Sequence, residues 1–307
     1  MRRAIVSGIT GHVGAVLGDQ LMAAGFQVHG LTRGGVGSTM QPASRMGIRL
    51  HHVDGRTQTL VSLFEEIQPD VVLHLAALAR HKHLTTDISP LVTANILFGT
   101  QLLEAAKLVG CRSFITTGSH LQYGENARHH AFNLYAATKT AFEEILAYFV
   151  DSFGFSAIAL TLCNVYSELD PRPTLLSQLL GAFADGTPLS LHTGEVWFDL
   201  VHVEDVAAAL IQSIRVLDHH RAEGIGLSHY SVSAGRDMSC AELMTVIEAL
   251  GLTRPNINYG RPEVPAYRVR PWRGICVPGW TPRIGIQEGV TRLLAHRAAR
   301  AEVTEDA

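Results

Sequence analysis

The sequence predicts an α/β fold with a doubly wound parallel sheet. Short apolar runs, each bounded by glycine or polar residues, alternate with segments whose apolar residues recur at helical spacing. A glycine-rich turn follows the first apolar run. Alternation of strand and helix indicates right-handed βαβ units, in which helices cover both faces of a parallel sheet.

Five apolar runs are predicted to be buried strands, because they are short, continuous and flanked by turn residues. In chain order they are Ala4–Val6, Gln27–Leu31, Val71–Leu75, Ser113–Thr117 and Ser156–Leu162, with one more strand expected just before Asp54. The predicted helices cover Val13–Ala24, Thr59–Ile67, Pro90–Val109 and Leu134–Phe153.

The turn after the first strand leads directly into a helix and contains three spaced glycines. Gly8 permits a tight turn, Gly11 lets the backbone approach a diphosphate, and Gly14 lets the helix pack closely on the sheet. Backbone amides at the start of a helix attract an anion. A plain tight turn is the alternative to the Rossmann-type dinucleotide site that we expect here. The residues of that site are Gly8, Thr10, Gly11, His12, Val13 and Gly14.

Proline becomes frequent after Asn164 and divides the chain into shorter elements. We therefore expect residues 1–165 to form the dinucleotide-binding domain. Residues 166–307 are expected to form mainly a smaller α/β substrate-binding lobe, with segments that return to the first domain.

The end of the second strand distinguishes NAD from NADP, since a carboxylate there bonds the adenosine ribose and an arginine accommodates a 2′-phosphate. The segment His29–Arg33 contains no carboxylate. Arg33 therefore favours NADP(H), and NAD(H) is the alternative if Arg33 is only a solvated loop residue. Asp54 is placed to meet the adenine amino group, or else to serve a turn.

Tyr135 and Lys139 lie four residues apart at the start of a predicted helix, which places both side chains on one face. A phenol has a pKa of about 10, and a nearby ammonium lowers that value toward neutrality. We expect Tyr135 to be the catalytic acid or base and Lys139 also to hold the nicotinamide ribose. Ser119 follows a predicted strand and is expected to bond a substrate oxygen. Tyr/Lys pairs at this spacing also occur on ordinary helix surfaces. The prediction of a catalytic site therefore depends on finding the pair together with the glycine loop and with Ser119.

These motifs together resemble those of the NAD-dependent epimerase/dehydratase family, the extended branch of the short-chain dehydrogenases/reductases. The resemblance covers nearly the whole chain and implies an enzyme that acts on a nucleotide-activated sugar. Besides the GxxGxxG and YxxxK patterns, the matching segments are His74–Ala77, Asn95, Asn164–Tyr166, Gly186–Leu189, Asp199–Val206, Gly279–Pro282 and Glu288–Gly289.

The resemblance also implies roles for individual residues. Ala76 and Ala77 would line the cofactor, with small core residues as the alternative. Asn164 would contact the substrate diphosphate, or else cap a turn. Arg268 and Arg270 are further candidates for the substrate site, because guanidinium groups match phosphate oxygens. The alternative is that these two arginines only form ion pairs on the protein surface.

The choice of reaction depends on the residues after Ser119. The family's 4,6-dehydratases carry an acidic pair there, where this chain has His120-Leu121, so dehydration is disfavoured. We place His120 in the substrate site, where an imidazole can exchange a proton near neutral pH. Thr161 stands where many epimerases have an arginine, and Trp197-Phe198-Asp199 replaces an expected Arg-Asp pair.

With dehydration disfavoured, hydride transfer is the remaining reaction type of the family. We expect reduction of a 4-keto (deoxy)sugar nucleotide by NADPH, with Tyr135 donating the proton and Ser119 bonding the developing alkoxide. A nucleotide-sugar 4-epimerase with tightly bound NAD is the main alternative. A protein that binds NADP without turnover, and a reductase of a non-nucleotide carbonyl, are two others.

Composition restricts the partners and the location. Hydrophobic residues make up 47% of the chain and charged residues 17%, and the net charge of -3 provides no basic field for nucleic acid or an anionic membrane surface. Apolar stretches are too short for a signal peptide or a membrane span, so we expect a cytoplasmic protein. The cysteines and histidines lack the spacing of a metal site, and no metal is expected. The family resemblance implies a homodimer formed through helices such as Pro90–Val109 and Leu134–Phe153.

Overall fold

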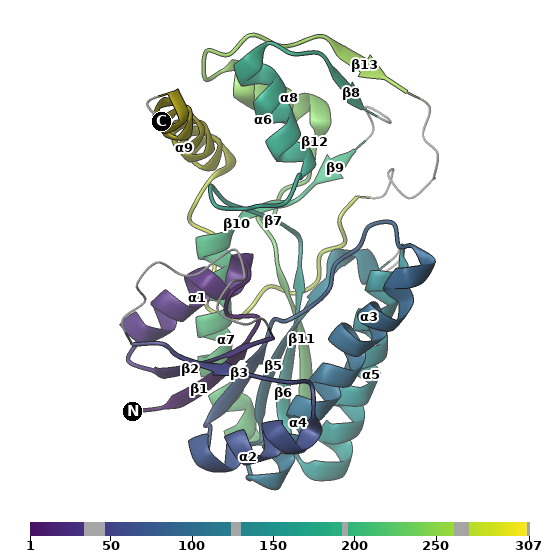
Figure 1. Ribbon diagram of the computed structural model, residues 1–307, viewed down its shortest axis with the longest axis vertical. Coiled ribbons are helices and arrows are strands. Elements are labelled where there is room, and N and C mark those ends of the chain that lie inside the picture. The colour runs from purple at the N-terminus through teal and green to yellow at the C-terminus, as the bar shows by residue number, and fades with distance from the viewer. Residues whose placement is uncertain (34–46, 124–129, 192–195, 261–269, 306–307) are drawn as a thin grey trace.

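A seven-stranded parallel sheet forms the centre of the protein in the computed structural model (Figure 1). The structure describes residues 1–33, 47–123, 130–191, 196–260 and 270–305, with side chains described as far as residue 300. The strand order β11-β6-β5-β4-β1-β2-β3 shows that the chain starts inside the sheet and winds outward in both directions, which confirms the predicted doubly wound fold. The strands are β1 (Arg3–Ser7), β2 (Gln27–Thr32), β3 (Arg49–His52), β4 (Val71–His74), β5 (Ser113–Ser119), β6 (Ser156–Leu162) and β11 (Leu227–Val232).

Helices cover both faces of this sheet, and each face has its own apolar core. On one face lie α1 (His12–Ala23) and α7 (Val203–Glu223), which pack against each other as well as on the strands (Figure 1). The other face is covered by α2 (Thr57–Ile67), α4 (Phe98–Leu108) and α5 (Leu134–Phe153). The five central strands, β1, β2, β4, β5 and β6, are buried on both faces, as their continuous apolar runs predicted.

One predicted helix differs from the structure. The segment Pro90–Val109 was expected to be one regular helix, but a π-helical turn at Thr93–Leu97 separates α3 (Ile88–Val92) from α4. The inserted residue changes which side chains face inward, and Asn95 of this turn is fully buried. Apolar spacing alone does not reveal such a turn, because the flanking segments keep a helical pattern.

The strand β11 was not among the predicted strands. Its sequence Leu-Ser-His-Tyr-Ser-Val lacks the continuous apolar run of the others, yet it pairs in parallel with β6 at the edge of the sheet. Strand β11 and helix α7 therefore bring the chain back to the sheet after residue 200.

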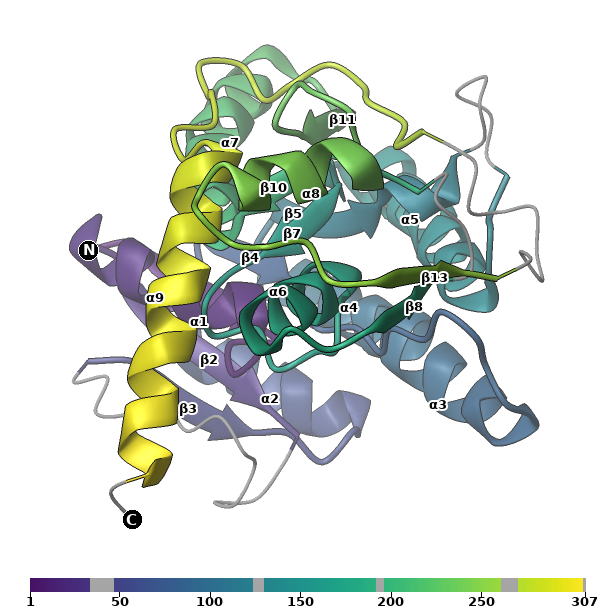
Figure 2. The ribbon, with the colours of Figure 1, turned by 90° about the horizontal axis from the view of Figure 1, so that it is seen from above.

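The remaining elements lie above the carboxyl ends of the sheet strands and enclose a third apolar core (Figures 1 and 2). Two parallel pairs, β7 with β10 and β8 with β13, and the antiparallel pair β9 with β12, connect the helices there. These elements are α6 (Leu175–Asp185), α8 (Cys240–Glu248), α9 (Ile286–Glu305), β7 (Asn164–Tyr166), β8 (Leu189–Leu191), β9 (Trp197–Phe198), β10 (Leu200–His202), β12 (Met238–Ser239) and β13 (Ile257–Tyr259). Among the described residues, we find no helix with the length and apolarity needed to cross a bilayer.

Candidate active site

The glycine loop joins the carboxyl end of β1 to the first turn of α1. Gly8 has a φ of 75°, and a Cβ atom there would lie 2.7 Å from the backbone nitrogen of Ala76. A Cβ on Gly14 would collide with the carbonyl oxygen of Gly8. The amide of Gly11 donates to that same carbonyl over 2.9 Å, and α1 begins at the next residue. The loop is therefore as tight as the sequence predicted, and it presents a helix amino terminus at the edge of the sheet.

Below this loop, a buried histidine ties β4 to β1. Nδ1 of His74 lies 2.7 Å from Oγ of Ser7, and the same hydroxyl accepts the amide of Ala76 over 3.2 Å. Burial, together with the charge of Lys139, lowers the pKa of His74 to about 3, so the ring is neutral. This arrangement holds the backbone of Ala76 against Gly8, and both residues were predicted to line the cofactor site. Ala77, the next residue predicted to line it, is exposed.

Asn95 links the segment after β4 to the helix that carries Tyr135 and Lys139. Its Oδ1 accepts the amide of Leu78 over 2.7 Å, and its Nδ2 donates to the carbonyl of Leu78 and to Oγ1 of Thr138. In the sequence, Asn95 stood out only as one of the segments that match the family. The structure shows that it sets the distance between the β4 end and α5.

Lys139 is buried, and its Nζ has no hydrogen-bond partner within the described part of the chain. Burial lowers the pKa of this ammonium to about 8. Asn133 caps the amino terminus of α5, where its side chain accepts the amide of Ala136, so both Tyr135 and Lys139 lie in the first two turns of the helix. A buried ammonium without protein partners gains from acceptor oxygens of water or of a ligand, and the ribose hydroxyls of a nicotinamide dinucleotide are acceptors of this kind.

Tyr135 differs from expectation in one respect. We expected Lys139 to lower the pKa of the phenol, but burial raises this pKa to about 12, and the main opposing charge is that of Arg172. The cost of ionising a phenol away from water exceeds the attraction of the nearby cations. In this structure Tyr135 is therefore a protonated phenol at neutral pH.

Ser119 is the last residue of β5 and is nearly buried. Its Oγ accepts the amide of Leu121 over 3.3 Å. His120 lies beside it, with Nδ1 3.4 Å from the carbonyl oxygen of Leu162, and burial lowers its pKa to about 4. This lowered pKa acts against the predicted proton exchange by His120 near neutral pH, because a poorly solvated ring disfavours the charged form.

At the other end of the cofactor site, the ends of β2 and β3 lie side by side, with Thr32 paired to His52. Arg33 follows directly and is exposed. The Asp54 carboxylate accepts the amide of Arg56 over 2.9 Å, so in this structure it serves the turn that was the alternative interpretation.

Two other residues predicted for the substrate site, Asn164 and Arg270, contact elements that lie above the sheet. Oδ1 of Asn164 accepts the amide of Asp199 over 3.2 Å, which ties β7 to the segment before β10. The guanidinium of Arg270 lies 4.1 Å from the centre of the Trp197 ring, and it is 4.0 Å from a carboxylate oxygen of Asp237. Arg268 lies outside the described residues.

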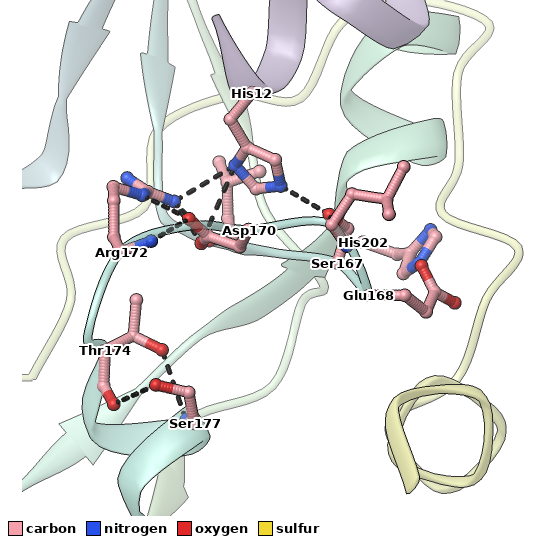
Figure 3. A network of polar contacts seen from close by, with 10 residues as sticks. His12, Ser167, Glu168, Asp170, Arg172, Thr174, Ser177 and His202 are labelled. Atoms are coloured by element: carbon pink, nitrogen blue, oxygen red, sulfur yellow. Dashed lines mark hydrogen bonds and ion pairs between the residues drawn. The ribbon is translucent and has the colours of Figure 1, made fainter. Parts of the chain in front are cut away.

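A polar network that sequence analysis did not predict joins the glycine loop to the segment after β7 (Figure 3). Nδ1 of His12 lies 3.0 Å from the guanidinium of Arg172, and its Nε2 lies 2.6 Å from Oγ of Ser167. Since arginine only donates, Nδ1 is the acceptor and Nε2 carries the proton. Burial lowers the pKa of His12 to about 4, in agreement with a neutral ring. Asp170 completes the network as the carboxylate partner of Arg172.

Comparison with known proteins places this geometry in a family. Residues 4–228, most of the chain, match the model of the NAD dependent epimerase/dehydratase family. The chain belongs to this family. The resemblance inferred from the sequence motifs is thereby confirmed.

Two relatives match over nearly their full length. A UDP-glucose 4-epimerase of Mycolicibacterium smegmatis is 27% identical over 94% of this chain and 96% of the relative. A CDP-abequose synthase of Salmonella muenchen is 21% identical over 96% of this chain and 97% of the relative. Among solved structures, MoeE5 in complex with UDP-glucuronic acid and NAD is 25% identical with a TM-score of 0.82, covering 97% of this chain and 99% of that one.

Proposed function

We propose that the protein is a nicotinamide-dependent oxidoreductase of nucleotide-activated sugars, and that its reaction is reduction of a 4-keto (deoxy)sugar nucleotide. The observation that carries this proposal is the buried Lys139 ammonium, which has no partner in the described structure and lies one helical turn beyond Tyr135. Relatives named for UDP-glucose and CDP-abequose support a nucleotide sugar as the substrate.

The state of Tyr135 favours the reductive direction. With a pKa of about 12 the phenol keeps its proton at neutral pH, so it can act as an acid without prior ionisation. A reduced nicotinamide, when bound, supplies the hydride. Tyr135 then gives its proton to the carbonyl oxygen, so that the carbonyl carbon gains a hydrogen and the oxygen becomes a hydroxyl. Solvent returns a proton to the phenolate afterwards, and Lys139 stabilises its charge meanwhile.

Ser119 orients the substrate in this scheme. It ends the strand beside β6, and its hydroxyl is placed to donate to the carbonyl oxygen while charge develops there. The tight glycine loop and the amino terminus of α1 are proposed to bind the cofactor diphosphate, as the family description would require.

NADPH is proposed as the reductant, because β2 ends without a carboxylate and Arg33 is exposed at that end. The family description and the MoeE5 complex both name NAD. NADH is therefore the alternative reductant, and affinity for the two cofactors distinguishes them.

A nucleotide-sugar 4-epimerase with bound NAD is the second candidate. The full-length match to a UDP-glucose 4-epimerase favours it. Its first step would require Tyr135 to be a phenolate that accepts a proton, and the raised pKa of the phenol opposes that ionisation at neutral pH. Dehydration is disfavoured because positions 120 and 121, a neutral histidine and a leucine, hold no carboxylate.

The test is a mixing assay at 340 nm with NADPH or NADH and a panel of 4-keto-6-deoxy nucleotide sugars. We expect substrate-dependent loss of absorbance, reduced roughly 10²- to 10⁴-fold in Tyr135→Phe. If absorbance does not change, but denatured protein releases NAD and a nucleotide sugar changes configuration, the epimerase is correct and the reductase is wrong.

A further inference from the structure

A buried glutamine joins the end of β5 to helix α5. Oε1 of Gln122 accepts the amide of Ser119 over 2.7 Å, and its Nε2 donates to Oε1 of Glu143 over 2.9 Å. Gln122 is completely shielded from solvent. Both ends of its amide are thus used, one on the residue proposed to orient the substrate and the other on the helix that carries the proposed acid.

Glu143 is the far end of this connection, and it lies on the active-site face of α5. It follows Lys139 by four residues, as Lys139 follows Tyr135, so the three side chains form one stripe along the helix. Its carboxylate is almost fully buried. The fit is close, since a Cβ atom on Gly118 would lie 2.5 Å from Oε1 of Gln122 and 2.9 Å from Oε1 of Glu143.

The second carboxylate oxygen has no hydrogen bond in the described structure, although Nε2 of His229 on β11 lies 3.7 Å away. The other titratable groups that face this carboxylate are Lys139 on its own helix and Tyr123 beyond the end of β5. Burial lowers the pKa of Lys139, and the Glu143 charge is the influence that raises it. A buried carboxylate is costly, and an unpaired buried ammonium one turn away is the group that gains from it.

We propose that Glu143 is a positioning residue of the active site, which holds Ser119 in place through Gln122 and stabilises the ammonium of Lys139 through its charge. This inference rests on the proposed function for its catalytic meaning. The geometric part, one carboxylate acting on both Ser119 and Lys139, does not depend on which sugar is reduced.

The charge effect can be measured on the unliganded protein, because the chain contains only three lysines, Lys82, Lys107 and Lys139. Protein labelled with ¹³Cε-lysine should give three titrating signals, with that of Lys139 identified by its loss in Lys139→Met. We expect its midpoint near pH 8 in the unmodified protein. Glu143→Gln keeps an acceptor for Gln122 but removes the charge, and it should lower the midpoint by about one pH unit or more.

The matched control is Glu144→Gln, since Glu144 is the next residue on the helix and is exposed. This change should leave the Lys139 midpoint where it is. If Glu143→Gln also leaves the midpoint at the control value, the proposed action on Lys139 is overturned.

The hydrogen-bonding part is tested with Gln122→Met, which matches the side-chain length but removes both bonds. If the variant folds and melts at the same temperature as the unmodified protein, we expect its kcat to be about tenfold lower at every pH and the Lys139 midpoint to be unchanged. An unchanged kcat would overturn the link to Ser119. The two proposals can fail separately. If the unmodified protein reduces none of the keto sugars, the proposed reaction is wrong. If Glu143→Gln still shifts the Lys139 midpoint, the proposed role of Glu143 is retained.

Discussion

Nε2 of His12 lies 2.6 Å from Oγ of Ser167, although the two residues are 155 positions apart in the chain. His12 is the first residue of α1, directly after the glycine loop, and Ser167 belongs to the segment that leads from β7 to α6 (Figure 3). This hydrogen bond connects the proposed cofactor site to the elements above the sheet. It is partly shielded from water, so breaking it leaves a polar group without a partner.

We predict a measurable coupling between these two side chains. In a double-mutant cycle of His12→Ala and Ser167→Ala, the free energies of unfolding should depart from additivity by about 1 kcal/mol, since each single change already removes the bond. Urea denaturation of the four proteins gives this coupling. As a control, Ser177→Ala should combine additively with His12→Ala, because the Ser177 hydroxyl bonds to Thr174. Additive behaviour of His12 with Ser167 would contradict the bond.

Stability should decrease in mild acid because several histidines are buried in the neutral form. Burial lowers the pKa of His12 and His120 to about 4 and of His74 to about 3, whereas in the unfolded chain each is near 6.5. The unfolded state therefore binds more protons between these values, so this stability is fully present above pH 6.5 and is lost as the pH falls toward 4. We expect the free energy of unfolding to fall between pH 7 and pH 5 by on the order of 1 kcal/mol for each histidine.

A single variant checks the origin of this loss. His120→Asn removes one proton site, so the slope of unfolding free energy against pH should decrease by up to one proton. Burial raises the pKa of Asp199, which acts in the opposite direction, and this carboxylate is unchanged by the variant. An identical slope in His120→Asn would show that His120 is solvated in the folded protein.

Local motifs explain what the sequence could predict. The glycine loop, the Tyr135 and Lys139 pair and the end of β5 each depend on residues within seven positions of one another, and the structure has the loop and the helix where they were expected. The alternation of strand and helix predicted the doubly wound parallel sheet.

Contacts between distant residues explain what could not be predicted. Gln122 and Glu143 meet only because β5 and α5 are neighbours, and Arg172 meets His12 only because the segment after β7 folds over the glycine loop. The pKa of Tyr135 was predicted in the wrong direction for the same reason, since burial is a property of the whole fold. The lowered pKa of His120 likewise comes mainly from burial.

Cofactor preference can be tested at Arg33. If this exposed guanidinium contacts a 2′-phosphate, Arg33→Ala should weaken NADPH binding by roughly 10- to 100-fold, which corresponds to one or two charged hydrogen bonds, and leave NADH binding unchanged. Fluorescence titration of the two reduced cofactors measures both constants.

The control for this experiment is Arg49→Ala, because Arg49 is an exposed arginine at the opposite end of β3. It should leave both affinities unchanged. Tighter binding of NADH than NADPH in the unmodified protein would contradict the NADPH proposal directly and favour the epimerase.

Exposed apolar side chains on one side of α3 and its flanking turns favour the predicted homodimer. Leu84, Ile88 and Val92 follow one another at steps of four, and Leu97 follows after a step of five that spans the π-helical turn. All four are exposed, which is unusual for so many large apolar groups along one segment. The five-residue step matches the wider π turn, so Leu97 stays near the same side.

We therefore expect the protein to be a dimer by light scattering at micromolar concentration, and the double variant Val92→Glu with Leu97→Glu to be a monomer. Two carboxylates buried against a second copy would be unpaired, which costs several kcal/mol in order of magnitude and exceeds what a modest interface supplies. Ile275→Glu is the matched control, since Ile275 is a more exposed apolar residue that lies outside these helices. A charge there should leave the dimer intact. Only monomer in the unmodified protein would remove the dimer, and a dimer that persists in the double variant would move the interface to another surface.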